Sequence, residues 1–185
     1  MKPIAPIVAL LVIASTPARS QDLVPPIPGV TATIGLDGTL EKFYADTHQA
    51  IVKSADGVRH LLHLSSRTVV HGGSTADDPL GGLENGSHVV VQYVEEGDTK
   101  MAVEIDRIGN GGLTAVEGVV TNIDRSAKTL TVRLADGFPV RLHLTDQAAR
   151  HVGTNIELET PVILYYADEG GEWVAHYFRR TDGKR

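Results

Sequence analysis

Cysteine is absent from this sequence, and its absence excludes several kinds of chemistry at once. The chain can form no disulfide, and it offers no thiolate to act as a nucleophile or to bind a metal ion. Methionine is nearly absent too, since Met101 is the single one besides Met1. Sulfur-rich sites for soft metal ions are therefore excluded, and apolar cores must stabilise the fold without covalent cross-links.

Positive charge is also scarce. The 17 Lys and Arg residues are outnumbered by 23 Asp and Glu residues, which gives a formal net charge of −6. No local cluster of basic residues reverses this balance, and an acidic surface repels phosphate backbones and anionic lipid headgroups. We therefore expect no nucleic-acid partner.

The chain lacks an apolar run long enough to span a bilayer as a helix, but it begins with the pattern of a secretory signal peptide. Lys2 precedes an uncharged apolar run at residues 4–14, and Ala18 and Ser20 place small residues at −3 and −1 of a cleavage site before Gln21. An uncleaved membrane anchor is the alternative, whereas the missing cysteine excludes a bacterial lipoprotein. Cleavage of residues 1–20 lowers the formal net charge to −8 and predicts a periplasmic or secreted protein with no membrane insertion.

What the sequence does contain is an internal repeat. A shift of 80 positions aligns four short motifs with their copies: Gly38 with Gly118, Ala-Asp-Gly at 55–57 and 135–137, Leu-His-Leu at 62–64 and 142–144, and His71 with His151. Residues 89–97 match residues 162–170 at a shift of 73. Two copies of one unit predict two similar domains. We place them at residues 38–108 and 115–180, with a flexible Pro/Gly leader at 21–37, a Gly-rich linker at 109–114 and a C-terminal tail at 181–185.

The second copy shows the local structure most clearly. Apolar and polar residues alternate at 130–134 and 140–144, which is typical of half-buried strands, and the Ala-Asp-Gly between them predicts a hairpin turn. Val120 and Ile123 are apolar but three apart, so a β-bulge is expected near Thr121. Thr145 is placed to cap a short helical turn that Gly153 would end.

Each copy thus contains five predicted strands with a connecting element between the third and the fourth, and this order of elements is typical of an OB-like barrel. The predicted fold class is therefore all-β: two tandem five-stranded OB-like small barrels, the second with a short helical turn between strands three and four. The alternative is one sandwich or pseudo-symmetric sheet that pairs both copies.

The recurring glycines, the Ala-Asp-Gly turns and the Leu-His-Leu strands resemble the small exported bacterial OB-like domains of unknown function, over most of the mature chain. A weaker likeness connects the chain with the periplasmic copper-binding barrels of metal-efflux systems. Those barrels bind copper with a His, a Trp and two closely spaced Met residues. This sequence has no Met-x-Met, so the resemblance does not imply a copper site here.

Histidine is the residue type that raises the question of a metal site. The repeat-related histidines are His63, His71, His143 and His151. They are the ligands that the alternative function, a periplasmic metal-binding protein, would use. Without thiolates, however, we expect no tight site, and the preferred prediction is that the protein has no cofactor.

Aromatic residues gather on the last two predicted strands of the second copy. Alternation leaves Tyr165, Trp173 and Tyr177 outside the barrel core, so we expect them to form a contact face for the other copy or for a protein or small-molecule partner. The sequence contains no nucleophile motif and no phosphate-binding loop. The preferred function is an exported, non-enzymatic binding or accessory protein.

Overall fold

The computed structural model describes residues 33–72, 80, 83–109 and 111–181. The predicted signal peptide, most of the leader and most of the C-terminal tail lie outside these residues. No helix in the described part of the chain is long and apolar enough to cross a membrane.

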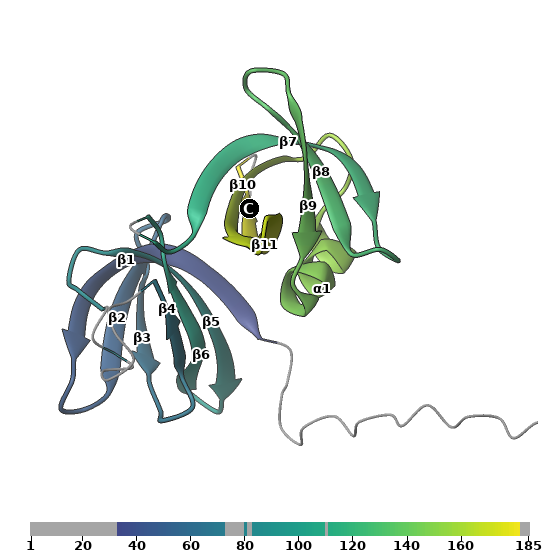
Figure 1. Cartoon of the computed structure of the whole chain (residues 1–185). Helices are drawn as coiled ribbons and strands as arrows, with labels where there is room; N and C mark the ends of the chain where they lie inside the picture. The colour runs from purple at the N-terminus through teal and green to yellow at the C-terminus, as the bar shows by residue number, and fades with distance from the viewer. Residues whose placement is uncertain (1–32, 73–79, 81–82, 110, 182–185) are drawn as a thin grey trace, which may run out of the picture.

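The first half of the chain forms a barrel, seen at the lower left of Figure 1. Its strands are β1 (Ile34–Tyr44), β2 (Gln49–Ser54), β3 (Arg59–His63), β4 (Val69–His71), β5 (His88–Glu96) and β6 (Thr99–Arg107). The sheet runs β3-β2-β1-β5-β6-β4, and a parallel pairing of β3 with β6 closes a ring of five strands. The short β4 was not predicted. It pairs with the same edge of β6 as β3 does, a few residues further along.

The second half forms a closed five-stranded barrel in the order β10-β11-β9-β8-β7. Its elements are β7 (Thr114–Asp124), β8 (Thr129–Leu134), β9 (Pro139–Leu144), α1 (Asp146–Asn155), β10 (Pro161–Glu169) and β11 (Glu172–Arg180). Here too a parallel pair, β9 with β11, completes the ring. The prediction of an all-β fold with two barrel-like units and one short helix is confirmed.

The hairpin turns and the bulges lie where the sequence predicts them. Gly57 and Gly137 occupy the turns after β2 and β8 with φ of 84° and 88°, a region that glycine adopts without steric cost. The pairing of β7 with β8 shifts register between Val120 and Asn122, and β1 shifts likewise beside Leu40. Each long first strand can therefore bend around its barrel.

Helix α1 begins as predicted but ends later. The Thr145 hydroxyl accepts a hydrogen bond of 3.1 Å from the Ala148 amide and caps the helix. The prediction that Gly153 ends it is wrong, because the helix continues to Asn155 with Ile156 as C-cap. Val152 and Ile156 are buried in the core of the second barrel, and this packing outweighs the poor helix propensity of one glycine.

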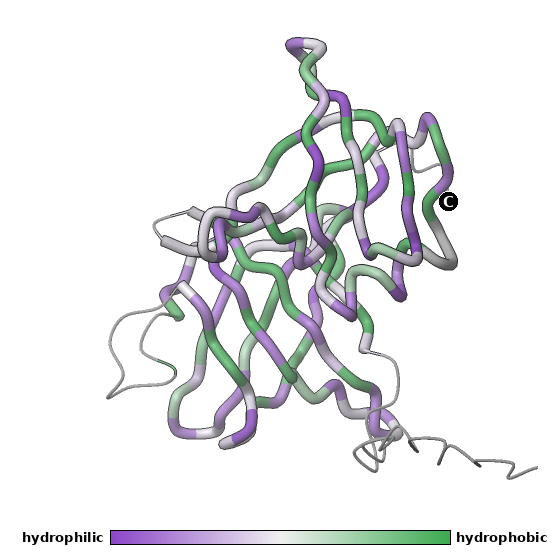
Figure 2. The backbone as a smooth tube through the Cα atoms, turned by 45° about the vertical axis from the view of Figure 1, so that its right-hand side comes forward, coloured by the Kyte–Doolittle hydropathy of each residue, from purple (hydrophilic) through white to green (hydrophobic). Residues whose placement is uncertain are grey.

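Each barrel has its own apolar core, and a third cluster lies where the barrels meet. Apolar and polar residues alternate along many strands, as Figure 2 shows. The inward residues fill the two barrel interiors. Some outward residues instead form the third cluster: Val90, Leu113, Tyr165 and Tyr177, with Ile108, Ile163 and Ala167 against them. The two barrels are therefore in contact over a small apolar interface.

Candidate metal centre between the two barrels

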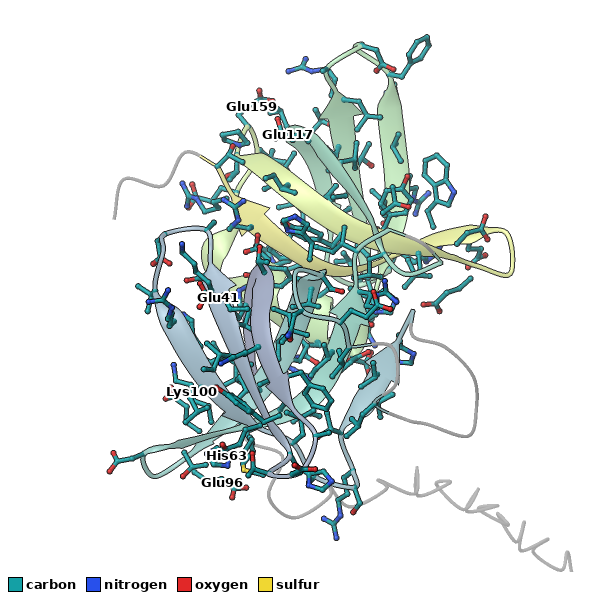
Figure 3. All side chains as sticks on the ribbon, turned by 90° about the vertical axis from the view of Figure 1, so that its left-hand side faces the viewer. Glu41, His63, Glu96, Lys100, Glu117 and Glu159 are labelled. Atoms are coloured by element: carbon teal, nitrogen blue, oxygen red, sulfur yellow. The ribbon has the colours of Figure 1, made fainter. Side chains whose placement is uncertain are left out.

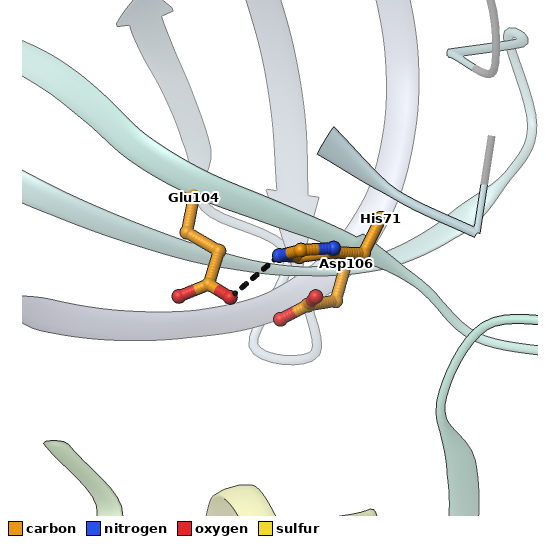
Figure 4. Close-up of side chains that lie close together, drawn as sticks. All are labelled: His71, Glu104 and Asp106. Atoms are coloured by element: carbon orange, nitrogen blue, oxygen red, sulfur yellow. Dashed lines mark ion pairs between the residues drawn. The ribbon is translucent and has the colours of Figure 1, made fainter. Parts of the chain in front are cut away.

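A cluster of ligand-type side chains begins on β6 of the first barrel. Glu104 and Asp106 lie two apart on this strand and so share one face, and His71 on β4 is paired with Asp106. His71 Nε2 lies 3.2 Å from Glu104 Oε1 (Figure 4). One ligand atom from each of the three residues lies within 4.8 Å of the others. This spacing is close enough for one metal ion to contact all three.

A β-bulge turns Glu104 and Asp106 away from the barrel core. Register between β5 and β6 shifts so that Val103 has no paired residue. Ala102 and Ile105 can therefore both be buried in the core, although they are three apart. The bulge is what directs the two carboxylates outward, toward the second barrel.

Asp106 is the unusual member of the cluster. Its side chain is 1% exposed, and within the described part of the chain neither carboxylate oxygen has a hydrogen-bond partner. Burial, and next the negative charge of Glu104, raise the pKa of Asp106 to about 6, while His176 and His71 act in the opposite direction. A buried carboxylate without hydrogen bonds is costly, and native proteins rarely keep one without a reason.

The second barrel contributes a histidine to the same place. His176 Nδ1 lies 3.9 Å from Asp106 Oδ2 and 4.0 Å from Glu104 Oε1. On the other side of the ring, His176 Nε2 donates a hydrogen bond of 2.7 Å to Glu169 Oε1. The cluster thus contains two imidazoles and three carboxylates, and no lysine or arginine is among the charged groups that shift the pKa of Asp106.

These donors are nitrogen and oxygen atoms of borderline to hard character. Imidazole and carboxylate ligands suit Zn²⁺ and similar divalent transition metals, whereas Cu(I) and Ag(I) prefer sulfur. The sequence offers no cysteine and one methionine besides Met1. The cluster is therefore chemically suited to a divalent ion of the zinc type.

The structure does not bring the four repeat-related histidines together. Of the four, His71 alone belongs to a described group of three or more ligand atoms. His63 lies at one end of the first barrel with Lys100 and Glu96 (Figure 3). His143 is half exposed, 3.9 Å from Glu172. His63 and His143 lie on equivalent strands of two different barrels, β3 and β9, and the structure therefore keeps them apart.

His151 serves the interface instead. It lies on α1, and its ring makes edge-on contacts with Tyr177 and Phe178 at centroid distances of 6.0 and 5.6 Å. Burial lowers its pKa. This environment favours the neutral ring and indicates a packing role.

The three aromatic residues of the predicted contact face are placed differently from one another. Tyr165 and Tyr177 do leave the core of the second barrel, but they are 5% and 8% exposed because the first barrel covers them. Of the two alternatives for these residues, a face for the other copy or a face for a partner, Tyr165 and Tyr177 follow the first. Trp173 remains 42% exposed, beside Tyr166 at a ring distance of 5.3 Å.

A second polar cluster borders a cavity of about 590 Å³ between the barrels. Lys100 Nζ lies 3.1 Å from His60 Nδ1, His60 Nε2 lies 3.2 Å from Ser54 Oγ, and Ser54 also donates to Asp56. Because a lysine ammonium can only donate, His60 Nδ1 accepts and its Nε2 carries the proton. Ser54 Oγ then accepts a hydrogen bond from His60 and donates its own hydrogen bond to Asp56. His60 does not act as a base toward this hydroxyl, so the cluster is not a nucleophile and base pair.

Sequence analysis missed four residues of the metal cluster: Glu104, Asp106, Glu169 and His176. A signal for three of them is present in the sequence. Ala102 and Ile105 are three apart in their strand, as are Ala175 and Phe178, which is the spacing that predicted the bulge beside Val120. Applied to these strands, it would have directed Glu104, Asp106 and His176 out of the cores.

Comparison with known proteins adds a likeness to one small barrel. No protein-family model and no curated protein matches the chain. Among solved structures, the crystal structure of Ag(I)CusF is similar with 12% identity and a TM-score of 0.33, over 41% of this chain and 97% of that chain. The structure of apo-CusF residues 6–88 from Escherichia coli is similar with 17% identity and a TM-score of 0.32, over 40% of this chain and 95% of that chain.

Proposed function

We propose that this protein is an exported, non-enzymatic binding protein whose ligand is a divalent metal ion of the zinc type. His71, Glu104 and Asp106 hold the ion at the contact between the two barrels. The observation that carries the proposal is the buried carboxylate of Asp106, whose oxygens accept no hydrogen bond in the described part of the chain and which has the imidazoles of His71 and His176 close by. A bound cation would remove the cost of this buried charge.

Metal binding was the alternative function expected from the sequence, but the ligands proposed here differ from the four repeat-related histidines. The aromatic contact face loses support because the first barrel covers Tyr165 and Tyr177. Of the repeat-related histidines, His71 stays as a ligand. The others are replaced by carboxylates that lie beside it on the neighbouring strand.

One feature favours binding over catalysis. Ser54, which lines the interbarrel cavity, donates a hydrogen bond to Asp56, and His60 does not act as its base. Export rests on the signal-peptide pattern of residues 1–20.

Calorimetric titration of protein purified after export, stripped of metal and then titrated with Zn²⁺, tests the proposal. We expect one saturable site with micromolar or tighter affinity, and an increase of the melting temperature that follows RT ln(1 + [L]/Kd). The variant Asp106→Asn should bind at least about tenfold more weakly. The matched control is Glu96→Gln, which changes an exposed carboxylate of the same barrel. Wild-type protein without a saturable site, or an Asp106→Asn variant with unchanged affinity, would overturn the proposal.

A further inference from the structure

We propose that the bound ion also locks the two barrels together, because His176 of the second barrel is its fourth ligand and Glu169 is the residue that positions His176. This inference rests on the proposed function and extends it to the regulation of the same site. Metal binding and the docking of the barrels then become one coupled event.

The hydrogen bond to Glu169 prepares His176 for this role. A histidine that binds a metal through one ring nitrogen usually donates the other N–H to a carboxylate or carbonyl oxygen. Glu169 Oε1 accepts a hydrogen bond of 2.7 Å from Nε2–H, so that in the neutral ring the lone pair is on Nδ1. Nδ1 is the nitrogen that faces Asp106 and Glu104. The pair thus has the tautomer and the orientation that a ligand needs.

Three of the donor separations can be compared with those of a tetrahedral site. Ligand bonds of about 2.0–2.1 Å to Zn²⁺ place neighbouring donor atoms about 3.3 Å apart. The His71–Glu104 separation is 3.2 Å, and the two separations that involve His176 are 3.9 and 4.0 Å. Of these three separations, the two wider ones cross between the barrels. Binding would therefore draw the second barrel toward the first by a fraction of an ångström to about one ångström.

The position of His176 in its strand allows this contact. The pairing of β10 with β11 passes from Tyr177 to Ala175, so His176 is the unpaired residue of a bulge. Ala175 lies in the core of the second barrel and Tyr177 in the interface cluster. The bulge therefore presents His176 at the interface without removing either neighbour from its place.

Away from the metal cluster, hydrogen bonds also join the two barrels. They connect Gln147 with Gln92, and Tyr165 and Arg179 with Asp37, and a longer one runs from Tyr177 to the Gly35 carbonyl. On the side of the metal cluster, the buried charge of Asp106 opposes docking until a cation is bound. Four protein ligands would also close the coordination shell, which is typical of structural rather than catalytic sites.

Distance measurement between spin labels tests the lock. Because the chain has no cysteine, labels can be attached at two introduced ones, Val58→Cys in the first barrel and Phe138→Cys in the second. Both positions are exposed. We expect Zn²⁺ to narrow the distance distribution between the labels and to shift it slightly. Zn²⁺ itself is diamagnetic and does not disturb the measurement.

His176→Gln in the labelled protein should still bind Zn²⁺ through the first barrel, roughly a hundredfold more weakly, and should show no narrowing at saturation. The matched control His143→Gln changes an exposed histidine of the same barrel and should behave like the parent. The proposed lock would be overturned if Zn²⁺ still narrowed the distance distribution in His176→Gln, or if this variant bound Zn²⁺ with unchanged affinity. Such a result differs from failure of the proposed function, in which the parent itself binds no Zn²⁺.

The positioning role of Glu169 has its own signature. Glu169→Ala should weaken Zn²⁺ binding about 10- to 100-fold and change the ¹⁵N shifts of the His176 ring, because Nε2–H loses its acceptor. Glu169→Gln keeps an acceptor oxygen and should restore most of both properties. Ring shifts that are unchanged in Glu169→Ala would contradict the assignment, even if the melting temperature fell.

Discussion

Tyr165 and Asp37 lie 128 positions apart in the sequence, and the Tyr165 hydroxyl donates a hydrogen bond of 2.7 Å to Asp37 Oδ2 across the contact between the barrels. Arg179 Nε donates to the same oxygen at 2.9 Å. Asp37 and Asp106 are both buried carboxylates at this contact, but the first has two donors and the second has none in the described structure. This difference supports a docking role for Asp37 and the proposed metal-ligand role for Asp106.

Tyr165→Phe should lower the free energy of unfolding by about 1–2 kcal/mol, because it removes one donor to a buried carboxylate and leaves Arg179 as the other. Urea denaturation measures the change. Tyr44→Phe, which alters an exposed tyrosine of β1, is the control and should stay within about 0.5 kcal/mol of the parent. Equal effects of the two substitutions would show that the hydrogen bond to Asp37 contributes little.

Stability should fall as the pH rises above about 10. Burial is the first cause that raises the pKa of both Tyr165 and Tyr177 well above the ordinary value of 10.0, and the negative charge of Asp37 acts in the same direction. In the unfolded chain these phenols ionise near pH 10, whereas in the folded protein they stay protonated to higher pH. The unfolded state therefore releases protons first and gains stability with rising pH. Denaturation between pH 9 and 12 should show this loss, and a Tyr165→Phe, Tyr177→Phe double variant should show less of it.

Asp106→Asn should stabilise the metal-free protein above pH 6 while it weakens Zn²⁺ binding. The raised pKa means that the folded state holds the proton to about pH 6, whereas the unfolded chain loses it near the ordinary value of 3.8. This stabilising contribution is complete at low pH and is lost as the pH rises through 6. An amide carries no charge, so the variant should gain about 1–2 kcal/mol at pH 7.5. Melting curves with and without chelator test it, and a variant less stable than the parent would contradict the burial cost.

Gly38→Ala and Gly118→Ala should each destabilise the fold by about 1–3 kcal/mol. A Cβ on Gly118 would lie 2.7 Å from the Arg133 carbonyl oxygen, and a Cβ on Gly38 would collide with the Lys53 carbonyl. The obstacle includes backbone in both cases, together with the Val132 side chain at Gly118, so it cannot move aside cheaply. Glu117→Ala, at an exposed neighbour in β7, controls for changes of strand propensity. Thermal melts of the three variants are sufficient for the comparison.

The sequence predicts the strands well because their information is local. Alternation, the Ala-Asp-Gly turns and the three-residue spacing of Val120 and Ile123 each involve residues that are close in the chain. The metal cluster, in contrast, depends on contacts between distant strands. His71 meets Asp106 through a three-residue strand, too short for alternation to detect, and His176 meets them only when the barrels dock.

Docking was also the reason why Tyr165 and Tyr177 could not be interpreted fully. Alternation shows that these side chains leave the barrel core, and the structure agrees. It does not show whether an outward residue faces water, a partner or the other barrel. That choice depends on the relative placement of two units whose contact surface is small.

Val103 and His176 are the unpaired residues of corresponding bulges, one in each barrel. A residue at such a position is not paired with a residue of the neighbouring strand, so its side chain can be replaced without disturbing the pairing of the strands. One barrel has an exposed valine there and the other a histidine that reaches its neighbour. The bulge is thus a position at which two barrels of the same fold differ in chemistry, and under the proposed function it is the position that supplies the second barrel's metal ligand.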